Sequence, residues 1–218
     1  LNEELYMAFD YKKEYKEFYL PPKKPQIVTV PRMNYIAVRG KGDPNQEGGE
    51  YQRAMSILYP IAYTLKMSPR CGKVTEGFFD YVVPPLEGLW WQEGIKGFDL
   101  GKKNTFNWIS MIRLPDFFTQ SDVQWAKDEV LRKKKLDAHS LEFFSFDEGL
   151  CVQMMHTGPF DTERESVELM DGFIDEEGYE NDFSEIRLHH EIYLSDFRKT
   201  QKDKLKTVIR HPIKKKEN

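Results

Sequence analysis

Glu191 is the side chain whose setting in this 218-residue chain first suggests chemistry. It lies in HHEIYLSD, residues 189–196, a stretch typical of a β-strand. Side chains alternate between the two faces of a strand, so residues 185–194 divide into two sets. One set is mostly apolar and suits packing under a helix: Ile186, Leu188, His190, Ile192 and Leu194. The other set carries charges and an aromatic ring: Glu185, Arg187, His189, Glu191 and Tyr193.

The charged set of this strand has two interpretations. In an ordinary two-sided strand it faces water. In a strand that borders a cleft, Glu191 lies at the bottom of a pocket, where a carboxylate could fix a cation or position a water molecule. The choice depends on what the other elements of the fold place opposite this face.

Aromatic residues favour the cleft. Trp90 and Trp91 are adjacent in LEGLWWQE, residues 86–93, so they point to opposite faces of a strand. One can enter the core, but the other needs a second apolar surface. Further aromatic residues lie nearby in the sequence: Phe78, Phe79, Tyr81, Phe106 and Trp108. They indicate either a well-filled core with an aromatic sheet face or a pocket on whose walls a flat or cationic molecule stacks, with ~0.5–2 kcal/mol for each cation–π contact.

The sequence gives no sign of a cofactor or a metal. It contains no phosphate loop, no dinucleotide glycine fingerprint, no HExxH and no nucleophile elbow. His189 and His190 are adjacent, so in a strand they face opposite ways and cannot bind one zinc ion together. Cys71 and Cys151 are predicted to be free thiols, with Cys151 a small buried side chain.

Two segments of the chain have the same pattern and should position these residues. Residues 33–66 and 149–179 each begin with an alternating strand, continue through a turn with glycine and proline, and end in an amphipathic helix. The first helix has an apolar face of Tyr51, Met55, Leu58, Ile61 and Ala62. The second has a comparable face, and Asp161 is its expected N-cap.

Strands are predicted to follow each helix. After the first come 77–83, 86–93 and 106–114, with Pro84 and Pro85 separating the first two; after the second come 185–196 and 205–213. A surface helix is expected at 121–135, capped by Ser121 or Asp122, and a hairpin turn at 147–149. The pattern predicts an α+β fold with a duplicated strand–helix–strand–strand unit, antiparallel sheets, helices on one side and a ligand cleft between the repeats.

We expect an N-terminal extension at 1–25, one domain at 26–213 with repeats at about 26–114 and 141–213, and a basic tail at 214–218. The net charge of −4 gives no overall attraction to nucleic acid, so no direct nucleic-acid binding is expected. No apolar run approaches the ~20 residues that cross a bilayer, and the N-terminus lacks a signal peptide. We therefore expect a cytoplasmic protein; its oligomeric state is left open.

The motifs YIAVRGKGDPN, DYVVPPLEGLWW, GLCVQMMHTGPFDTE and HHEIYLSD resemble those of the GyrI-like small-molecule-binding domain family. The resemblance covers nearly the whole chain after about residue 26; Phe197 stands where a proline is expected. It implies a tandem SHS2-like fold and places the family's buried, cation-binding glutamate at Glu191. The paired tryptophans resemble a stand-alone subfamily that hydrolyses cyclopropane-bearing DNA-alkylating natural products. Residues 1–25 are too few for a helix-turn-helix, so the sensor fold without a DNA-reading part is expected.

The leading hypothesis is a protein that binds flat aromatic or cationic xenobiotics in an aromatic cleft; whether it is also an enzyme that opens a strained ring is left open. Glu191 would position or deprotonate the attacking water, with Glu185 as the second candidate carboxylate. The expected ligand-binding residues are Trp91, Tyr193, Tyr59, Tyr81 and Trp108. The alternatives are a non-catalytic sequestering or sensor protein and an interaction module that inhibits a larger target.

Overall fold

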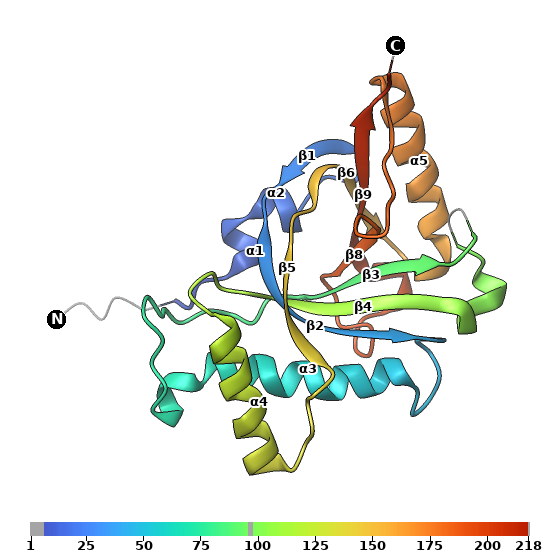
Figure 1. The fold of residues 1–218 in the computed structure, drawn as a ribbon. Helices are drawn as coiled ribbons and strands as arrows, with labels where there is room; N and C mark the ends of the chain where they lie inside the picture. The colour runs from blue at the N-terminus through green and yellow to red at the C-terminus, as the bar shows by residue number, and fades with distance from the viewer. Residues whose placement is uncertain (1–6, 96–97, 218) are drawn as a thin grey trace.

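An antiparallel sheet forms the centre of the computed structural model, which describes residues 7–95 and 98–217 (Figure 1). The sheet is strongly twisted, so that β2, β3 and β4 run across the direction of β1, β6 and β9. Its strand order is β1-β6-β9-β8-β3-β4-β2-β5, and β7 pairs with the free part of β9. Within the described residues the strands are β1 (Gln26–Val30), β2 (Met33–Lys41), β3 (Leu86–Gln92), β4 (Phe106–Leu114), β5 (Leu141–Phe146), β6 (Gly149–Thr157), β7 (Tyr179–Asn181), β8 (His189–Tyr193) and β9 (Lys206–Lys215).

Two long helices, α3 and α5, cover the same face of this sheet. On that face Tyr51 of α3 packs against Trp90 and Trp108, and Glu163 of α5 reaches Glu191. The predicted α+β architecture with antiparallel strands is confirmed, and the two long helices that cover the sheet lie on one side of it. The helices are α1 (Tyr11–Glu14), α2 (Lys16–Tyr19), α3 (Glu50–Lys66), α4 (Gln120–Lys134) and α5 (Glu163–Glu176), with short 3-10 turns η1 (Ser68–Cys71), η2 (Leu100–Thr105), η3 (Phe160–Thr162) and η4 (Lys202–Lys204).

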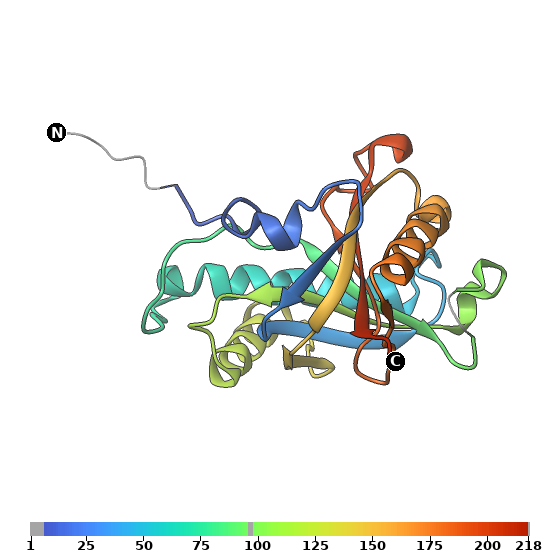
Figure 2. The same cartoon turned by 90° about the horizontal axis from the view of Figure 1, so that it is seen from above.

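The N-terminal segment covers part of the opposite face. Figure 2 shows α1 and α2 beside β1, and Tyr11, Phe18 and Tyr19 are buried in the core. Arg113 of β4 lies between the rings of Tyr11 and Tyr15, 4.7 and 4.8 Å from their centroids. Residues 9–20 are therefore an integral layer of the structure. Residues 1–6 of the predicted extension and residue 218 of the predicted tail lie outside the described residues.

Because both faces are covered, the two residue sets of β8 have roles that differ from those predicted. The set containing Glu191 faces α3 and α5, whereas His190 and Ile192 face the N-terminal layer. The prediction that the apolar set packs under the helices was wrong, because it assumed that only one face of the strand is buried. None of the helices in the described part of the chain has the length and hydrophobicity needed to cross a membrane.

Several predicted elements have different bounds or caps. Residues 77–83 are not a strand: apart from one bridge between Phe9 and Tyr81, the segment packs through aromatic contacts, such as Phe78 against Phe117. α4 begins with a capping box in which Thr119, one turn before Asp122, is the N-cap. Asp161 is not the N-cap of α5, because η3 precedes that helix.

Other local predictions are confirmed in part. The first helix occupies Glu50–Lys66. Residues 147 and 148 do connect β5 to β6, but the predicted hairpin is wrong, because β5 pairs with β2 whereas β6 pairs with β1 and β9. Both cysteines are free thiols; Cys151 is buried and Cys71 is exposed. β8 begins only at His189, so it is shorter than the predicted 185–196 strand.

A buried network of charges joins the two repeats on the face opposite α3 and α5. His190 lies between two carboxylates, with Nδ1 2.9 Å from Glu148 and Nε2 2.9 Å from Glu87. Arg210 donates to the second oxygen of Glu148 at 2.8 Å and to the backbone carbonyl of Phe18 at 2.9 Å. These contacts between acidic and basic groups link β3, β8 and β9 to the N-terminal layer.

The charges around His190 make the stability of the fold depend on pH. Although burial lowers it, the carboxylates of Glu148 and Glu87 raise the pKa of His190 from 6.5 to about 9. Because the pKa of His190 is higher in the folded protein than in the unfolded chain, protonated His190 stabilises the fold. This stabilisation is complete below pH 6.5 and is lost as the pH rises through about 9. We expect the difference in unfolding free energy between the wild type and His190→Gln to shrink by about 3 kcal/mol between pH 6.5 and 9, at ~1.4 kcal/mol per pKa unit.

Urea unfolding curves of both proteins across this pH range test the expectation. The comparison between the two proteins cancels the contributions of groups that they share. A difference that stays constant from pH 6.5 to 9 would show that His190 is not held protonated by its two carboxylates.

Candidate functional site

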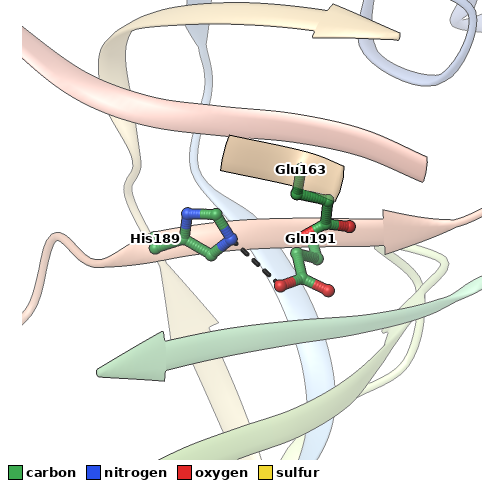
Figure 3. A group of neighbouring side chains, drawn as sticks. All are labelled: Glu163, His189 and Glu191. Atoms are coloured by element: carbon green, nitrogen blue, oxygen red, sulfur yellow. Dashed lines mark hydrogen bonds and ion pairs between the residues drawn. The ribbon is translucent and has the colours of Figure 1, made fainter. Parts of the chain in front are cut away.

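Glu191 lies in the middle of β8 and is buried, with 9% of its surface exposed. Its Oε1 atom is 3.0 Å from Nε2 of His189, two residues earlier on the same face of the strand. Glu163, the first residue of α5, approaches the same point from the helix above the sheet, as Figure 3 shows. Two carboxyl groups and one imidazole therefore meet in a buried position, where β8 and the start of α5 hold them.

Glu163 is the unusual member of this group. Only 9% of its surface is exposed, and its Oε1 atom has no hydrogen-bond partner among the described residues. Burial, followed by the charge of neighbouring Glu191, raises the pKa of Glu163 well above its usual value. Since two adjacent buried carboxyl groups do not both ionise readily, the pair favours retaining one proton.

Aromatic side chains surround the carboxyl pair. Nε1 of Trp90 donates a hydrogen bond to the Tyr193 hydroxyl at 2.8 Å, and the ring of Tyr51 lies 5.5 Å from that of Trp90. Burial and the charge of Glu191 raise the pKa of Tyr193 well above its usual value, so its hydroxyl remains protonated. The site therefore presents aromatic surfaces and neutral hydroxyl groups beside an acidic pair.

Gly88 makes this arrangement possible. It pairs with Glu191 across β3 and β8. A Cβ atom at this position would lie 2.5 Å from Nε1 of Trp90 and 3.0 Å from the Tyr193 hydroxyl. Any larger residue would push apart the hydrogen-bonded pair that lies next to Glu191.

His211 supports His189 from the neighbouring strand β9. Nδ1 of His189 is 2.7 Å from Nε2 of His211. Burial, together with the nearby His189, lowers the pKa of His211 well below its usual value, so His211 is neutral. This contact orients the ring of His189 so that its other nitrogen, Nε2, points at the carboxyl pair.

The structure brings together only some of the residues predicted for the site. Glu191 and Tyr193 are neighbours on one face of β8, and Trp108 lies close by, with its ring 5.2 Å from that of Tyr51. Glu185 is exposed in a bend before β8 and is not part of the group.

The remaining predicted aromatic residues lie elsewhere. Trp91 is half-buried on the opposite face of the sheet, because its neighbour Trp90 shares a face with Glu191. Tyr81 is buried in a separate aromatic cluster with Phe117 and Phe118. Tyr59, on α3, is 36% exposed.

Three residues of the group were not predicted from the sequence. Tyr51 was expected only on the apolar face of a helix, Trp91 rather than Trp90 was named as a ligand-binding residue, and Glu163 was not among the candidate site residues. One feature of the sequence does point to Glu163. It is an acidic residue at the start of a helix that follows a strand, and such a residue lies near the edge of the sheet. Nothing in the spacing shows that this edge lies over Glu191.

The fold and the site together define a small-molecule-binding α+β domain with a buried acidic group under aromatic side chains. The chain belongs to the GyrI-like small-molecule-binding domain family, whose description matches residues 23–214. The resemblance predicted from the sequence motifs is thereby confirmed. No curated protein sequence matches the chain significantly.

Solved structures of similar proteins agree with this assignment. An uncharacterized conserved protein from Listeria innocua is 48% identical with a TM-score of 0.89, over 95% of this chain and 100% of that chain. A protein from Listeria innocua described as a hydrolase is 45% identical with a TM-score of 0.86, over the same shares of both chains. The C-terminal domain of EcmrR, 14% identical with a TM-score of 0.53 over 88% of this chain and 98% of that chain, shares the fold alone.

Proposed function

We propose that the protein binds flat aromatic or cationic compounds at the Glu163–Glu191 pair and hydrolyses a strained cyclopropane ring in DNA-alkylating natural products. The observation that carries this proposal is the placement of two buried carboxyl groups, Glu163 and Glu191, beside Trp90, Tyr51 and Tyr193. A similar protein from Listeria innocua is described as a hydrolase, which supports a hydrolytic reaction at this site.

The two carboxyl groups would have opposite roles in ring opening. Glu191 takes a proton from a water molecule, whose oxygen bonds to a carbon of the strained ring. A carbon–carbon bond of the ring breaks, and its electron pair passes to an electron-accepting group of the ligand, such as a conjugated carbonyl. Glu163 gives its proton to that group. Proton transfer from Glu191 to Glu163 then restores the starting state, so the net reaction adds one water molecule.

The surroundings of the pair favour this chemistry. Because bulk water is excluded from a buried site, the electrostatic effect of each carboxyl group is stronger than in solution. Phe160, which is 40% exposed and packs edge-on against Tyr193 with ring centroids 5.8 Å apart, lies at the start of η3. We infer that a ligand reaches the carboxyl pair by displacing this side chain.

Mass spectrometry of the ligand tests the proposal. The protein is incubated with a cyclopropane-bearing alkylating compound, and we expect a product heavier than the ligand by one water molecule. Glu168→Gln is a matched control on the same helix, since Glu168 is exposed and pairs only with Arg164, and it should leave the rate unchanged. Recovery of the ligand at its original mass, at the rate of the protein-free sample, would refute hydrolysis.

A second function, binding without turnover, is supported by the small-molecule-binding character of the family. In that case a lipophilic cation should bind at micromolar concentration through the aromatic rings and the Glu191 carboxylate. The same experiment separates the two functions, because a sequestering protein returns its ligand unchanged.

A further inference from the structure

We propose that Glu163, His189 and Glu191 also form a binding site for a divalent transition-metal cation such as Zn²⁺. Each residue offers one ligand atom, and these three atoms lie within 4.8 Å of one another (Figure 3). Glu191 and His189 are two positions apart on one face of β8, while Glu163 comes from α5. The three donors therefore converge from two elements on one point.

The donor set suits a borderline-soft cation. Zn²⁺ binds imidazole nitrogen at ~2.0–2.1 Å and carboxylate oxygen at ~2.0–2.2 Å, so ligand atoms on one ion are separated by about 3–4 Å. Small side-chain adjustments at Glu163, His189 and Glu191 would bring the observed atoms into this range. Mg²⁺ and Ca²⁺ prefer an all-oxygen set, so an imidazole donor favours a transition metal.

The electrostatics of the group supply a separate reason for a cation. Glu163 is 9% exposed and its Oε1 atom has no hydrogen-bond partner among the described residues, although it lies beside a second carboxyl group. A buried polar atom without a partner is costly, and two adjacent carboxylates repel each other. A divalent cation would satisfy the free oxygen of Glu163 and compensate both negative charges.

The surroundings of His189 are also suited to metal binding. Its Nδ1 atom is occupied by the contact with Nε2 of His211 at 2.7 Å, so Nε2 is the nitrogen that faces Glu163 and Glu191. Histidine ligands of metals commonly have their second nitrogen held in this way. His189 and His190 face opposite sides of the sheet, as the sequence predicted, so they do not bind one zinc ion together. The proposed site uses His189 alone.

This inference does not depend on hydrolysis of an organic ligand. A metal ion and an organic cation would compete for the same two carboxyl groups, Glu163 and Glu191. Metal binding can be measured without any organic ligand, and a negative result would leave the proposed function untouched.

Calorimetric titration of the metal-free full chain with Zn²⁺ is the direct test. We expect one ion per chain with micromolar or tighter affinity and much weaker binding of Mg²⁺. Co²⁺ should give visible absorption bands typical of nitrogen and oxygen ligands in a low-coordinate site.

Variants identify the ligands. Glu163→Gln and His189→Asn should each weaken Zn²⁺ binding by at least about 10–100-fold. Glu168→Gln and His139→Asn, at exposed positions, should leave it unchanged. Far-ultraviolet circular dichroism confirms that each variant is folded, and the Co²⁺ spectrum of the wild type remains informative if one is not. The proposal is overturned if the wild type does not bind Zn²⁺, or if folded Glu163→Gln and His189→Asn both bind Zn²⁺ as tightly as the wild type.

Discussion

Glu191→Gln is expected to slow ring opening by ~10²–10⁴-fold, the range that general base catalysis contributes. Glutamine keeps the size of the side chain and can still accept a hydrogen bond from His189, but it cannot take a proton from water. The protonated Glu163 would still be present, so the loss isolates the base. The measurement is the rate at which the hydrated product forms, followed by mass spectrometry under single-turnover conditions.

Binding of an unreactive ligand provides the control for this variant. A lipophilic cation that carries no strained ring should still bind to Glu191→Gln, more weakly than to the wild type, because the aromatic residues Trp90 and Tyr51 remain. Such binding would show that the aromatic surface formed by Trp90 and Tyr51 is intact. Equal turnover by wild type and variant would remove Glu191 from the mechanism.

Arg210→Met is expected to lower the free energy of unfolding by about 3–5 kcal/mol, because it breaks a buried ion pair by removing one partner. Arg210 is 2% exposed and pairs with Glu148 at 2.8 Å, and its loss would leave a buried carboxylate with His190 as its remaining basic partner. The carbonyl of Phe18 would also lose a donor, which would loosen the N-terminal layer. Urea unfolding followed by circular dichroism measures the change.

A matched exposed pair gives the comparison. Arg198 contacts Asp196 at 2.9 Å, but its side chain is 70% exposed. Arg198→Met should therefore leave the free energy of unfolding almost unchanged, as is usual for a surface ion pair. If both variants lost the same small amount, the buried network would not hold the repeats together.

β8 connects the two features that these predictions address. His190 faces the buried charge network and Glu191 faces the carboxyl pair, so adjacent residues serve opposite sides of the sheet. Because the network fixes β8 against β3 and β9, the position of Glu191 is held by interactions on both sides of its strand. This explains why a carboxylate lies in the middle of a strand that is buried on both faces.

The amino-acid sequence by itself determined the repeated strand–helix pattern, the first helix, the turn at 147 and 148 and the family. These features depend on local periodicity, on turn residues and on motifs that are close together in the chain. It also singled out Glu191, because a charged residue among strand-forming neighbours is unusual and the motif HHEIYLSD resembles the family's.

Only the tertiary structure decided which residues lie around Glu191. Alternation divides a strand into two sets, but strand pairing determines which set meets which layer; the pairing of β3 with β8 puts Trp90, rather than Trp91, on the side of Glu191. Glu163 is 28 positions earlier in the chain and reaches Glu191 only because α5 packs over β6 and β9 with its first residue close to β8. Such contacts between distant segments arise from packing of the layers, and no local pattern in the sequence records them.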